Sequence, residues 1–225
     1  FLLLTLLLTA MGMVMVLSAS FPSAYYENNG NGAYYFVRQG IFAVLGLAAM
    51  FGLSKMNYQR LRGVGRLLLW GSILLLVLVI VPGNPIAITE NNGSGGLLGV
   101  GLGKGRQKFL YLPEEHNDCI FAVICEELGL VGACVIMLVF ALLILRGFWI
   151  ALHARDRFGA LLTVGVMTHL ALQTFLNIAV VSGFVPTTGI SLPFFSYGGT
   201  ALCLQLVEMG IVLSVSRQIP AARAG

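Results

Sequence analysis

The chain alternates between long apolar runs and shorter polar stretches, and the apolar runs predict most of its structure. An α-helix rises about 1.5 Å per residue, so an apolar run of about 20 residues can cross the hydrocarbon core of a bilayer. We therefore expect an all-α polytopic integral membrane protein with about six membrane-spanning helices, over residues 1–18, 41–53, 67–81, 119–145, 159–181 and 199–215.

The polar stretches between these runs predict the loops. Ser20–Gly40 has the composition of a loop, because Pro22 and a cluster of Asn and Gly lie in it, and its aromatic side chains suit a membrane interface. The second span is expected to extend backwards into this stretch as far as Tyr35. We expect one membrane domain over residues 1–225, with three N-terminal spans in 1–83, a long extracytoplasmic loop in 84–118 and three C-terminal spans in 119–217.

Composition supports the membrane assignment and argues against a nucleic-acid partner. Hydrophobic residues make up 58% of the chain, charged residues only 10%, and the mean hydropathy is +0.91. A soluble domain is far less apolar. The formal net charge is +4, from 13 Lys and Arg against 9 Asp and Glu, but the cations sit beside the ends of apolar runs and form no basic face. We interpret them as signals of membrane topology.

The distribution of these cations predicts how the chain crosses the membrane. Lys and Arg gather in the connections 55–66 and 146–157 and in the C-terminal tail, which fall on one side of the predicted membrane. Cytoplasmic loops carry an excess of Lys and Arg, so both termini are expected to be cytoplasmic. The expected outside loops are 19–38, 84–118 and 182–198.

Most groups able to do chemistry lie between Gly95 and Gly132, where glycines, charges and a following apolar run meet. Polar groups pressed against a hydrophobic segment indicate chemistry at a membrane surface. Lys104, Arg106 and Lys108 lie on the predicted outer side of the membrane, where Lys and Arg are otherwise scarce. This position favours a binding role for these three cations over a role in setting topology; contact with lipid headgroups is the alternative. The candidate residues are Lys104, Arg106, Lys108, Glu114, Glu115, His116 and Asp118.

Common site motifs do not fit this chain. The glycine run GVGLGKG has neither the spacing of a dinucleotide site nor the K-[ST] of a phosphate loop, and no serine-nucleophile pattern is found. The four cysteines have no metal-ligand spacing, and we expect packed thiols and no metal site at Cys119, Cys125, Cys134 and Cys203.

Polar residues inside the predicted spans recur at helical spacing. One stripe holds His169, Gln173 and Asn177, at i, i+4 and i+8, and a weaker one holds Gln205 and Glu208. These side chains either form hydrogen bonds across helix interfaces, the interpretation we favour, or line a polar cavity between helices. A structural role is also favoured for Glu126 and Glu127, roughly 12 to 14 Å along a helix from Asp118, in the outer half of the membrane.

Two long motifs resemble the signatures of the SEDS family, the RodA, FtsW and SpoVE proteins of bacterial shape, division and sporulation. LPEEHNDCIFAVICEELGLVGA, residues 112–133, is similar to the family's LPE-x-HTDFIFA-x-x-x-EELG signature. PTTGISLPFFSYGGTA, residues 186–201, resembles its P-x-TG-x-x-LPF-x-SYGGSS signature. The segment before the first motif and the N-terminal span with its loop also match.

The chain departs from the family pattern in the number of spans and beside the acid. The family has about ten spans, and those between its third and seventh are missing after Gly83. Because the number of missing spans is even, the remaining loops and termini keep the side of the membrane that they have in the family. A fragment, an internal deletion and an unbuilt segment all fit this difference. Asn117 stands where Thr is usual and Cys119 where Phe is usual, and both flank Asp118.

The resemblance implies a peptidoglycan glycosyltransferase of the bacterial cytoplasmic membrane that polymerises lipid II, an undecaprenyl-diphosphate-linked substrate, outside the membrane. Asp118 matches the family's essential acid and would be the catalytic base. The alternative is a purely structural role, in which the Asp118 carboxylate caps the following helix. The three cations would hold the diphosphate. The other implied substrate-binding residues are Glu114, Glu115, His116, Ser196, Tyr197, Gly198 and Gly199.

The resemblance also implies partners and leaves alternatives. A class B penicillin-binding protein transpeptidase is the expected protein partner, beside lipid II and the membrane lipids. No cofactor is required by the motifs, and a divalent cation bound by Glu114 or Glu115 is left open. Ser196–Gly199 is expected to form a tight re-entrant turn against the catalytic loop. The alternative functions are a lipid II flippase and an inactive, truncated scaffold that binds a penicillin-binding protein.

Overall fold

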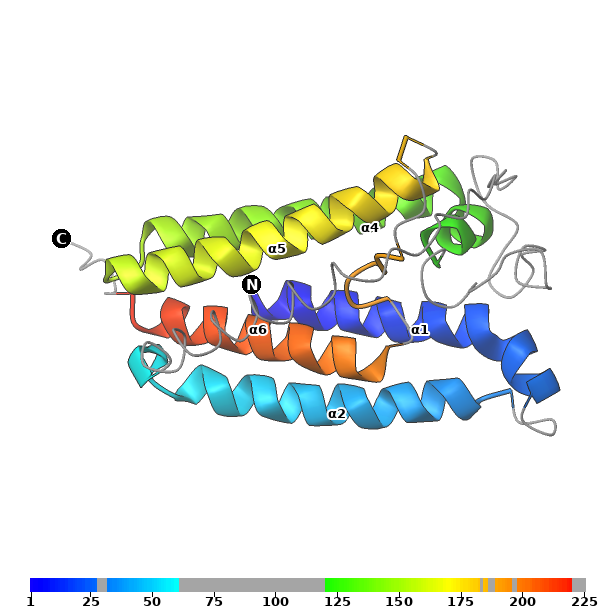
Figure 1. Cartoon of the computed structure of the whole chain (residues 1–225), viewed down its shortest axis with the longest axis horizontal. Helices are drawn as coiled ribbons and strands as arrows, with labels where there is room; N and C mark the ends of the chain where they lie inside the picture. The colour runs from blue at the N-terminus through cyan, green and yellow to red at the C-terminus, as the bar shows by residue number, and fades with distance from the viewer. Residues whose placement is uncertain (28–31, 61–119, 183, 186–188, 196–197, 220–225) are drawn as a thin grey trace, which may run out of the picture.

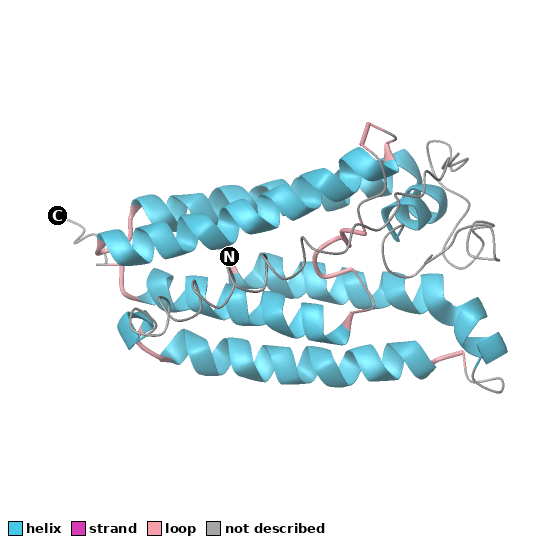
Figure 2. Ribbon diagram, viewed as in Figure 1, coloured by secondary structure: helices cyan, strands magenta, loops and turns pink. Residues whose placement is uncertain are grey.

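The structure is a computed structural model in which residues 1–27, 32–60, 120–182, 184–185, 189–195 and 198–219 are described. Every regular element of this part of the chain is helical, which confirms the predicted all-α class (Figure 2). The elements are α1 (Leu2–Glu27), α2 (Tyr34–Lys55), the short 3-10 helix η1 (Tyr58–Arg60), α4 (Ile120–Leu152), α5 (Arg157–Val181) and α6 (Gly199–Arg217).

The five α-helices are each long and apolar enough to cross a membrane. They run roughly along the long axis of the molecule, with α4 beside α5 and α2 beside α6 (Figure 1). α1 contacts both α2 and α4 and so connects the two pairs. The span expected at 67–81 and the loop expected at 84–118 lie outside the described residues.

The outer surface of the helices is apolar as well as the interior. Leu8, Met50, Ile136, Leu170 and Leu206 are at most 1% exposed and belong to one core that all five helices share. Large apolar side chains also cover the outside, a surface that lipid solvates and water does not. Among the most exposed are Leu3, Val44, Leu138, Leu145, Leu161, Phe175 and Leu204.

Glycines allow α2 and α6 to pack closely. A Cβ at Gly46 would lie 2.7 Å from the Leu206 side chain, and one at Gly210 would lie 2.8 Å from the Met50 backbone. The Cys203 thiol donates to the Phe42 carbonyl oxygen at 3.0 Å, as a packed thiol can. Small residues of this kind are typical of helix interfaces in membranes, where close backbone approach provides much of the attraction.

The expectation of a packed thiol is wrong at one cysteine. Cys134 is exposed on α4, on the face that carries Leu130, Val131 and Leu138. A thiol behaves as a small apolar group, so it costs little on a face that contacts lipid. The sequence pattern could not distinguish the lipid-facing side of this uniformly apolar helix from its core-facing side.

The loop predicted at Ser20–Gly40 is shorter than expected, because α1 continues to Glu27 and α2 already begins at Tyr34. The Ser20 hydroxyl donates to the Val16 carbonyl oxygen at 2.6 Å, so its polar group is satisfied within the helix. Pro22 lacks an N–H and so removes one helical hydrogen bond. α1 bends toward its C-terminal end but does not stop there (Figure 1).

The predicted end of the fourth span at Arg146 is also wrong, because α4 continues to Leu152. The Arg146 guanidinium lies 4.3 Å from the centre of the Trp149 ring, a contact that stabilises a cation on an otherwise apolar helix. The connection to α5 is consequently short and holds His153, Arg155 and Asp156.

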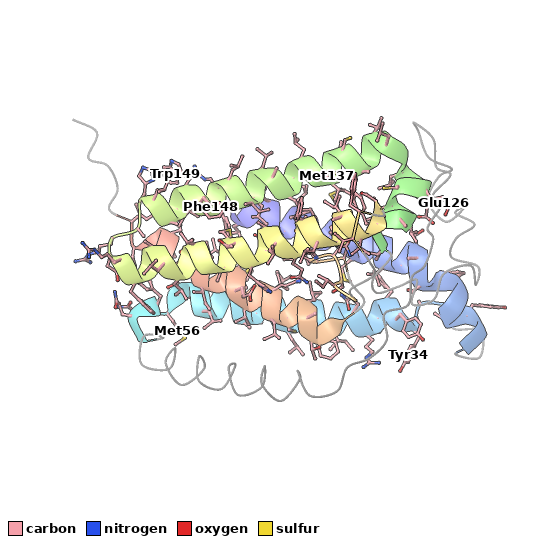
Figure 3. The ribbon with its side chains drawn as sticks, turned by 45° about the horizontal axis from the view of Figure 1, so that its top comes forward. Tyr34, Met56, Glu126, Met137, Phe148 and Trp149 are labelled. Atoms are coloured by element: carbon pink, nitrogen blue, oxygen red, sulfur yellow. The ribbon has the colours of Figure 1, made fainter. Side chains whose placement is uncertain are left out.

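The predicted basic connections meet at one end of the molecule, which we call the basic end. Arg217 Nη1 donates to the Ser54 carbonyl oxygen at 3.1 Å, and Gln59 Nε2 donates to Oδ2 of Asp156 at 2.8 Å. Met56 and Trp149 lie toward this end, whereas Tyr34 and Glu126 lie toward the opposite end (Figure 3). The described parts of the three basic connections therefore share one side, as their charge predicts.

A hydrogen-bonded carboxylate joins two of these connections. The Tyr58 hydroxyl donates to Oδ1 of Asp156, and this bond is the main cause that holds the pKa of Asp156 below its ordinary value of 3.8. The Asp156 carboxylate therefore binds a proton less tightly in the folded state than in the unfolded chain. The contribution of the carboxylate to stability is present above about pH 4 and is lost as the pH falls below that value.

We expect Asp156→Asn to lower the free energy of unfolding at pH 7 by no more than about 1 kcal/mol, because the site is open to water. At pH 3 the difference from the wild type should shrink, because the wild-type carboxylate is then increasingly protonated. Thermal unfolding in detergent at the two pH values measures this. An equal destabilisation at both values would contradict the linkage.

Candidate functional site

The predicted catalytic loop is attached directly to described helices. Asp118 stands two residues before Ile120, where α4 begins, and Gly198 and Gly199 open α6. The other predicted site residues lie, like Asp118, outside the described residues, so their roles stay predictions; they are Lys104, Arg106, Lys108, Glu114, Glu115, His116, Ser196 and Tyr197.

Residues 189–195, between α5 and α6, form a segment that we call the re-entrant segment. It lies among the helices rather than outside them (Figure 1), and Leu192, Phe194 and Phe195 are at most 2% exposed. The rings of Phe194 and Phe195 lie 6.3 and 6.0 Å from that of Phe140 on α4. Three residues of the second sequence motif are therefore part of the core.

Three amide side chains hold the backbone of the re-entrant segment. Gln173 Nε2 on α5 donates to the Ser191 carbonyl oxygen at 3.0 Å. Asn177 Nδ2, one turn further on, donates to the Ile190 carbonyl oxygen at 2.7 Å. From α6, Gln205 Oε1 accepts the Phe194 N–H at 2.7 Å. Gln173, Asn177 and Gln205 thus form hydrogen bonds between elements, the interpretation favoured from the sequence, and the partner of these three side chains is a loop backbone and not a facing helix.

The segment contains two residues in the left-handed region of backbone conformation. Gly189 has a φ of 69°, which costs a glycine little, whereas Phe194 has a φ of 64°. For a residue with a side chain this conformation costs about 1–3 kcal/mol. The hydrogen bond to Gln205 and the burial of the Phe194 ring offset that cost, so these contacts determine whether the segment keeps its path.

A glycine on α1 makes room for the same residue. A Cβ at Gly12 would lie 2.1 Å from the Phe194 carbonyl oxygen and 2.9 Å from its carbonyl carbon. Such a contact is with backbone, which cannot rotate away as a side chain can. The segment and α1 can therefore pack in this way only if position 12 has no side chain.

Gly198 and Gly199 begin α6 and pack against α2. The Gly198 carbonyl oxygen accepts the Leu202 N–H at 2.9 Å, as the first acceptor of the helix. A Cβ at Gly199 would lie 2.1 Å from Cδ2 of Phe42. Close packing therefore gives Gly199 a structural role, and the predicted contact of both glycines with substrate stays a prediction.

The remaining members of the two stripes, His169 and Glu208, contact each other between α5 and α6. His169 Nδ1 and Glu208 Oε1 are 3.5 Å apart, and their side chains are 59% and 29% exposed. An ionisable pair within membrane-spanning helices is costly unless its members neutralise each other. This pair therefore couples the two helices that carry the re-entrant segment at their ends.

The first two turns of α4 are separated from the rest of the helix by Gly129, which has a φ of 68° and a ψ of −172°. Figure 1 shows this first part, near Ile120, turned away from the main axis of α4. The break follows Glu126 and Glu127, which lie on this first part of α4, and the depth predicted for them in the membrane stays a prediction. Glycine is suited to this break because it adopts positive φ without a steric penalty.

Glu126 and Glu127 are 2% and 1% exposed on that first part of α4. The Ser18 hydroxyl on α1 donates to Oε2 of Glu127 at 2.5 Å. A buried carboxylate needs such donors, because its charge is otherwise poorly solvated. The contact fixes the beginning of α4 on α1, which supports the structural role favoured for Glu127.

We expect Ser18→Ala to destabilise the protein by about 1–3 kcal/mol, because a buried carboxylate oxygen loses a donor. Ser54→Ala is the matched control, since the Ser54 hydroxyl donates to the Phe51 carbonyl oxygen of its own helix in a solvent-exposed hydrogen bond. Thermal unfolding in detergent compares the two variants. Equal effects would show that the Ser18–Glu127 contact contributes nothing of its own.

Sequence reasoning missed Gly12, Ser18 and Gly129 as residues that shape this region. Each is a small residue within a strongly apolar run, and such small residues often mark helix contacts in membranes. That signal identifies candidates without naming their partners. No group of three His, Cys, Asp or Glu side chains able to hold a metal ion occurs among the described residues.

Comparison with known proteins gives concordant matches. The family model for FtsW, RodA and SpoVE, described as cell cycle protein, matches residues 1–92 and 86–220. Stage V sporulation protein E of Bacillus subtilis strain 168 is 52% identical over 125 residues, 56% of this chain and 34% of that protein. The probable peptidoglycan glycosyltransferase FtsW of Geobacter sulfurreducens is 50% identical over 130 residues, 58% of this chain and 35% of that protein.

Solved structures agree in fold. A mutant of the rod shape determining protein RodA of Thermus thermophilus has a TM-score of 0.71 at 23% identity, with 97% of each chain covered. A chain from a study of how a peptidoglycan synthase complex coordinates polymerization and crosslinking has a TM-score of 0.69 at 21% identity. The match to the two curated relatives spans about a third of their length.

Proposed function

Because the chain belongs to the cell cycle protein family of FtsW, RodA and SpoVE, we propose that it acts in a peptidoglycan glycosyltransferase that polymerises lipid II at the outer face of the bacterial cytoplasmic membrane. The name of the Geobacter relative, at 50% identity, supports the reaction. The fold supports the setting, since the described residues include five membrane-length helices.

The observation that carries the proposal is that α1 anchors both signature motifs. Ser18 contacts Glu127 of the first motif, and Gly12 packs against Phe194 of the second. The two anchor residues are six positions apart on one helix, about 9 Å along its axis. Parts of the chain separated by more than 60 residues thereby contact the same stretch of one helix, which supports a single site built from both motifs.

Asp118 would be the base of this site. Chain connectivity joins it to the part of α4 before Gly129, which the contact between Ser18 and Glu127 fixes. A sugar hydroxyl that attacks an anomeric carbon must lose its proton, and a carboxylate within hydrogen-bond reach can accept it. The 4-hydroxyl oxygen of the acceptor forms the new glycosidic bond, the bond from the donor sugar to its diphosphate breaks, and Asp118 takes the proton.

Lys104, Arg106 and Lys108 would receive the departing lipid diphosphate. Negative charge on the diphosphate increases as the bond breaks, and cations placed there stabilise that charge. One displacement inverts the configuration of the donor sugar, so no second carboxylate nucleophile is needed. Glu114, Glu115, His116 and Ser196–Gly199 would contact the sugars, and a divalent cation could be held by the two glutamates.

The sidedness of the chain follows from charge. With the basic end in the cytoplasm, both termini are cytoplasmic and the start of α4 lies at the outer face. Lipid II would reach the site from the surrounding bilayer. A class B penicillin-binding protein is the proposed partner, supported by the structural likeness to a chain from a study of a peptidoglycan synthase complex.

Polymerisation of lipid II by the purified full-length protein tests the proposed function. We expect long glycan strands on gels, and a greater yield with the cognate penicillin-binding protein. Movement of lipid II between leaflets without glycan would instead support a flippase. Binding of the partner with neither activity would support a scaffold, and either result would contradict the proposal.

A further inference from the structure

We infer that Gln173, Asn177 and Gln205 are positioning residues that fix the re-entrant segment, the backbone that precedes the predicted substrate-contacting residues of the second motif. The inference rests on the proposed function and adds to it a mechanism for how the second motif is held. The three amides are not catalytic residues, because they act through the re-entrant segment.

The hydrogen bonds reach the segment from two sides and at both of its ends. Gln173 and Asn177 on α5 hold the carbonyl oxygens of Ser191 and Ile190, at the beginning of the segment. Gln205 on α6 holds the N–H of Phe194, near its end. The amide N–H donors on α5 therefore match backbone carbonyl groups of the segment, and the amide oxygen acceptor on α6 matches a backbone N–H.

The environment makes these bonds difficult to replace. Asn177 is fully buried and Gln205 is 6% exposed, and the hydrogen bond between Gln205 and the Phe194 N–H is itself buried, so water has little access to that backbone group. The segment has no regular secondary structure to satisfy those groups itself. An unsatisfied backbone N–H within the membrane is strongly unfavourable, so a segment that loses its partner must move to find another.

Phe194 is the residue through which a shift of the re-entrant segment would reach the SYGG sequence. It has a left-handed backbone conformation, and its carbonyl group is packed against Gly12. Only Phe195 separates it from Ser196, the first residue of the SYGG sequence. A rotation of the Phe194 backbone after loss of Gln205 Oε1 would therefore redirect the chain where it enters the predicted substrate contacts.

The substitution Gln205→Met tests this directly, because it keeps the length of the side chain and removes the acceptor. We expect kcat/KM for lipid II polymerisation by the full-length protein to fall about 100-fold, the size of effect produced by misplacing reacting groups by about 1 Å. Gln205→Glu should restore most of the activity, since a carboxyl group retains an acceptor oxygen. Rescue of this kind distinguishes the lost hydrogen bond from lost packing.

Thr174→Val is the matched control. Thr174 lies on α5 between Gln173 and Asn177 and is buried, but its hydroxyl donates to the Leu170 carbonyl oxygen of its own helix at 2.8 Å. The control removes a buried hydrogen bond that does not involve the re-entrant segment, and kcat/KM should stay near the wild-type value. If Gln205→Met fails to fold, Gln173→Met serves the same purpose through Ser191.

A spin label at Ser196→Cys, in a background without the native cysteines, gives a readout independent of activity. We expect Gln205→Met to change the mobility of the label and Thr174→Val to leave it unchanged. If the wild type forms no glycan, the proposed function fails while the label still tests the placement. Unchanged mobility and kcat/KM in Gln205→Met, or equal changes in the control, would overturn the inference.

Discussion

Asp118→Asn is expected to reduce lipid II polymerisation at least about 100-fold, because an amide cannot accept the proton of the attacking hydroxyl and general base catalysis contributes about 10²–10⁴-fold. The variant should reach the membrane in normal amount and unfold at the wild-type temperature, since one polar side chain of similar size replaces another. Initial rates of glycan formation from lipid II, measured with purified proteins at equal concentration, give the result.

Asp156→Asn is the control with the same change of carboxylate to amide. Asp156 directly precedes α5 and accepts hydrogen bonds from Tyr58 and Gln59, and α5 begins at the end of the molecule opposite the start of α4 (Figure 1). Its substitution should leave polymerisation unchanged at neutral pH. Retained activity in Asp118→Asn, or an equal loss in both variants, would contradict the role proposed for Asp118.

Gly12→Ala is expected to destabilise the protein by about 1–3 kcal/mol or more, the cost of overpacking a well-filled core, and to abolish most polymerisation. The added Cβ would lie 2.1 Å from the Phe194 carbonyl oxygen, so either α1 or the re-entrant segment must move. Thermal unfolding and the rate of glycan formation measure the two effects separately.

Gly165→Ala controls for the change of glycine to alanine in a membrane helix. Nothing lies within 4 Å of a Cβ at Gly165, so the substitution meets no obstacle and raises helix propensity. It should be neutral or slightly stabilising. Wild-type stability and activity in Gly12→Ala would show that the contact between α1 and Phe194 is not required.

The lengths of the apolar runs predicted the helices well, because crossing a bilayer requires a minimum number of apolar residues. The predicted helix ends were wrong where a polar residue or a proline was taken to end a helix. Ser20 satisfies its hydroxyl within the helix and Pro22 only bends it, so a stretch with loop composition is helical as far as Glu27. Arg146 is stabilised by Trp149, so one cation did not end α4.

Helical periodicity placed Gln173 and Asn177 on one face and indicated that they need polar partners. It could not identify those partners, because carbonyl groups of the re-entrant segment belong to the backbone and leave no mark in the sequence. The role of Gly129 was equally impossible to predict from the sequence. A glycine inside an apolar helical run does not reveal that its φ is positive, since that conformation follows from how α4 packs around it.

The predicted chemistry and the described structure meet at the start of α4. Sequence motifs predict the roles of Asp118 and the cations, whereas the structure describes contacts that hold the neighbouring parts of the two motifs: those of Ser18, Glu127 and the three amides. Motifs are informative about reacting groups because chemistry restricts residue type. Supports can be built from many side chains, so they are recognised only once the helices are in place.

Labelling of Asp118→Cys with a membrane-impermeant maleimide tests most directly whether this chain presents Asp118, the proposed catalytic base, at the outer face of the membrane. The native cysteines, Cys119, Cys125, Cys134 and Cys203, would first be replaced. In intact spheroplasts we predict rapid labelling from outside, which lipid II or an analogue that occupies the site slows. Labelling only after permeabilisation would place position 118 in the cytoplasm and contradict the account.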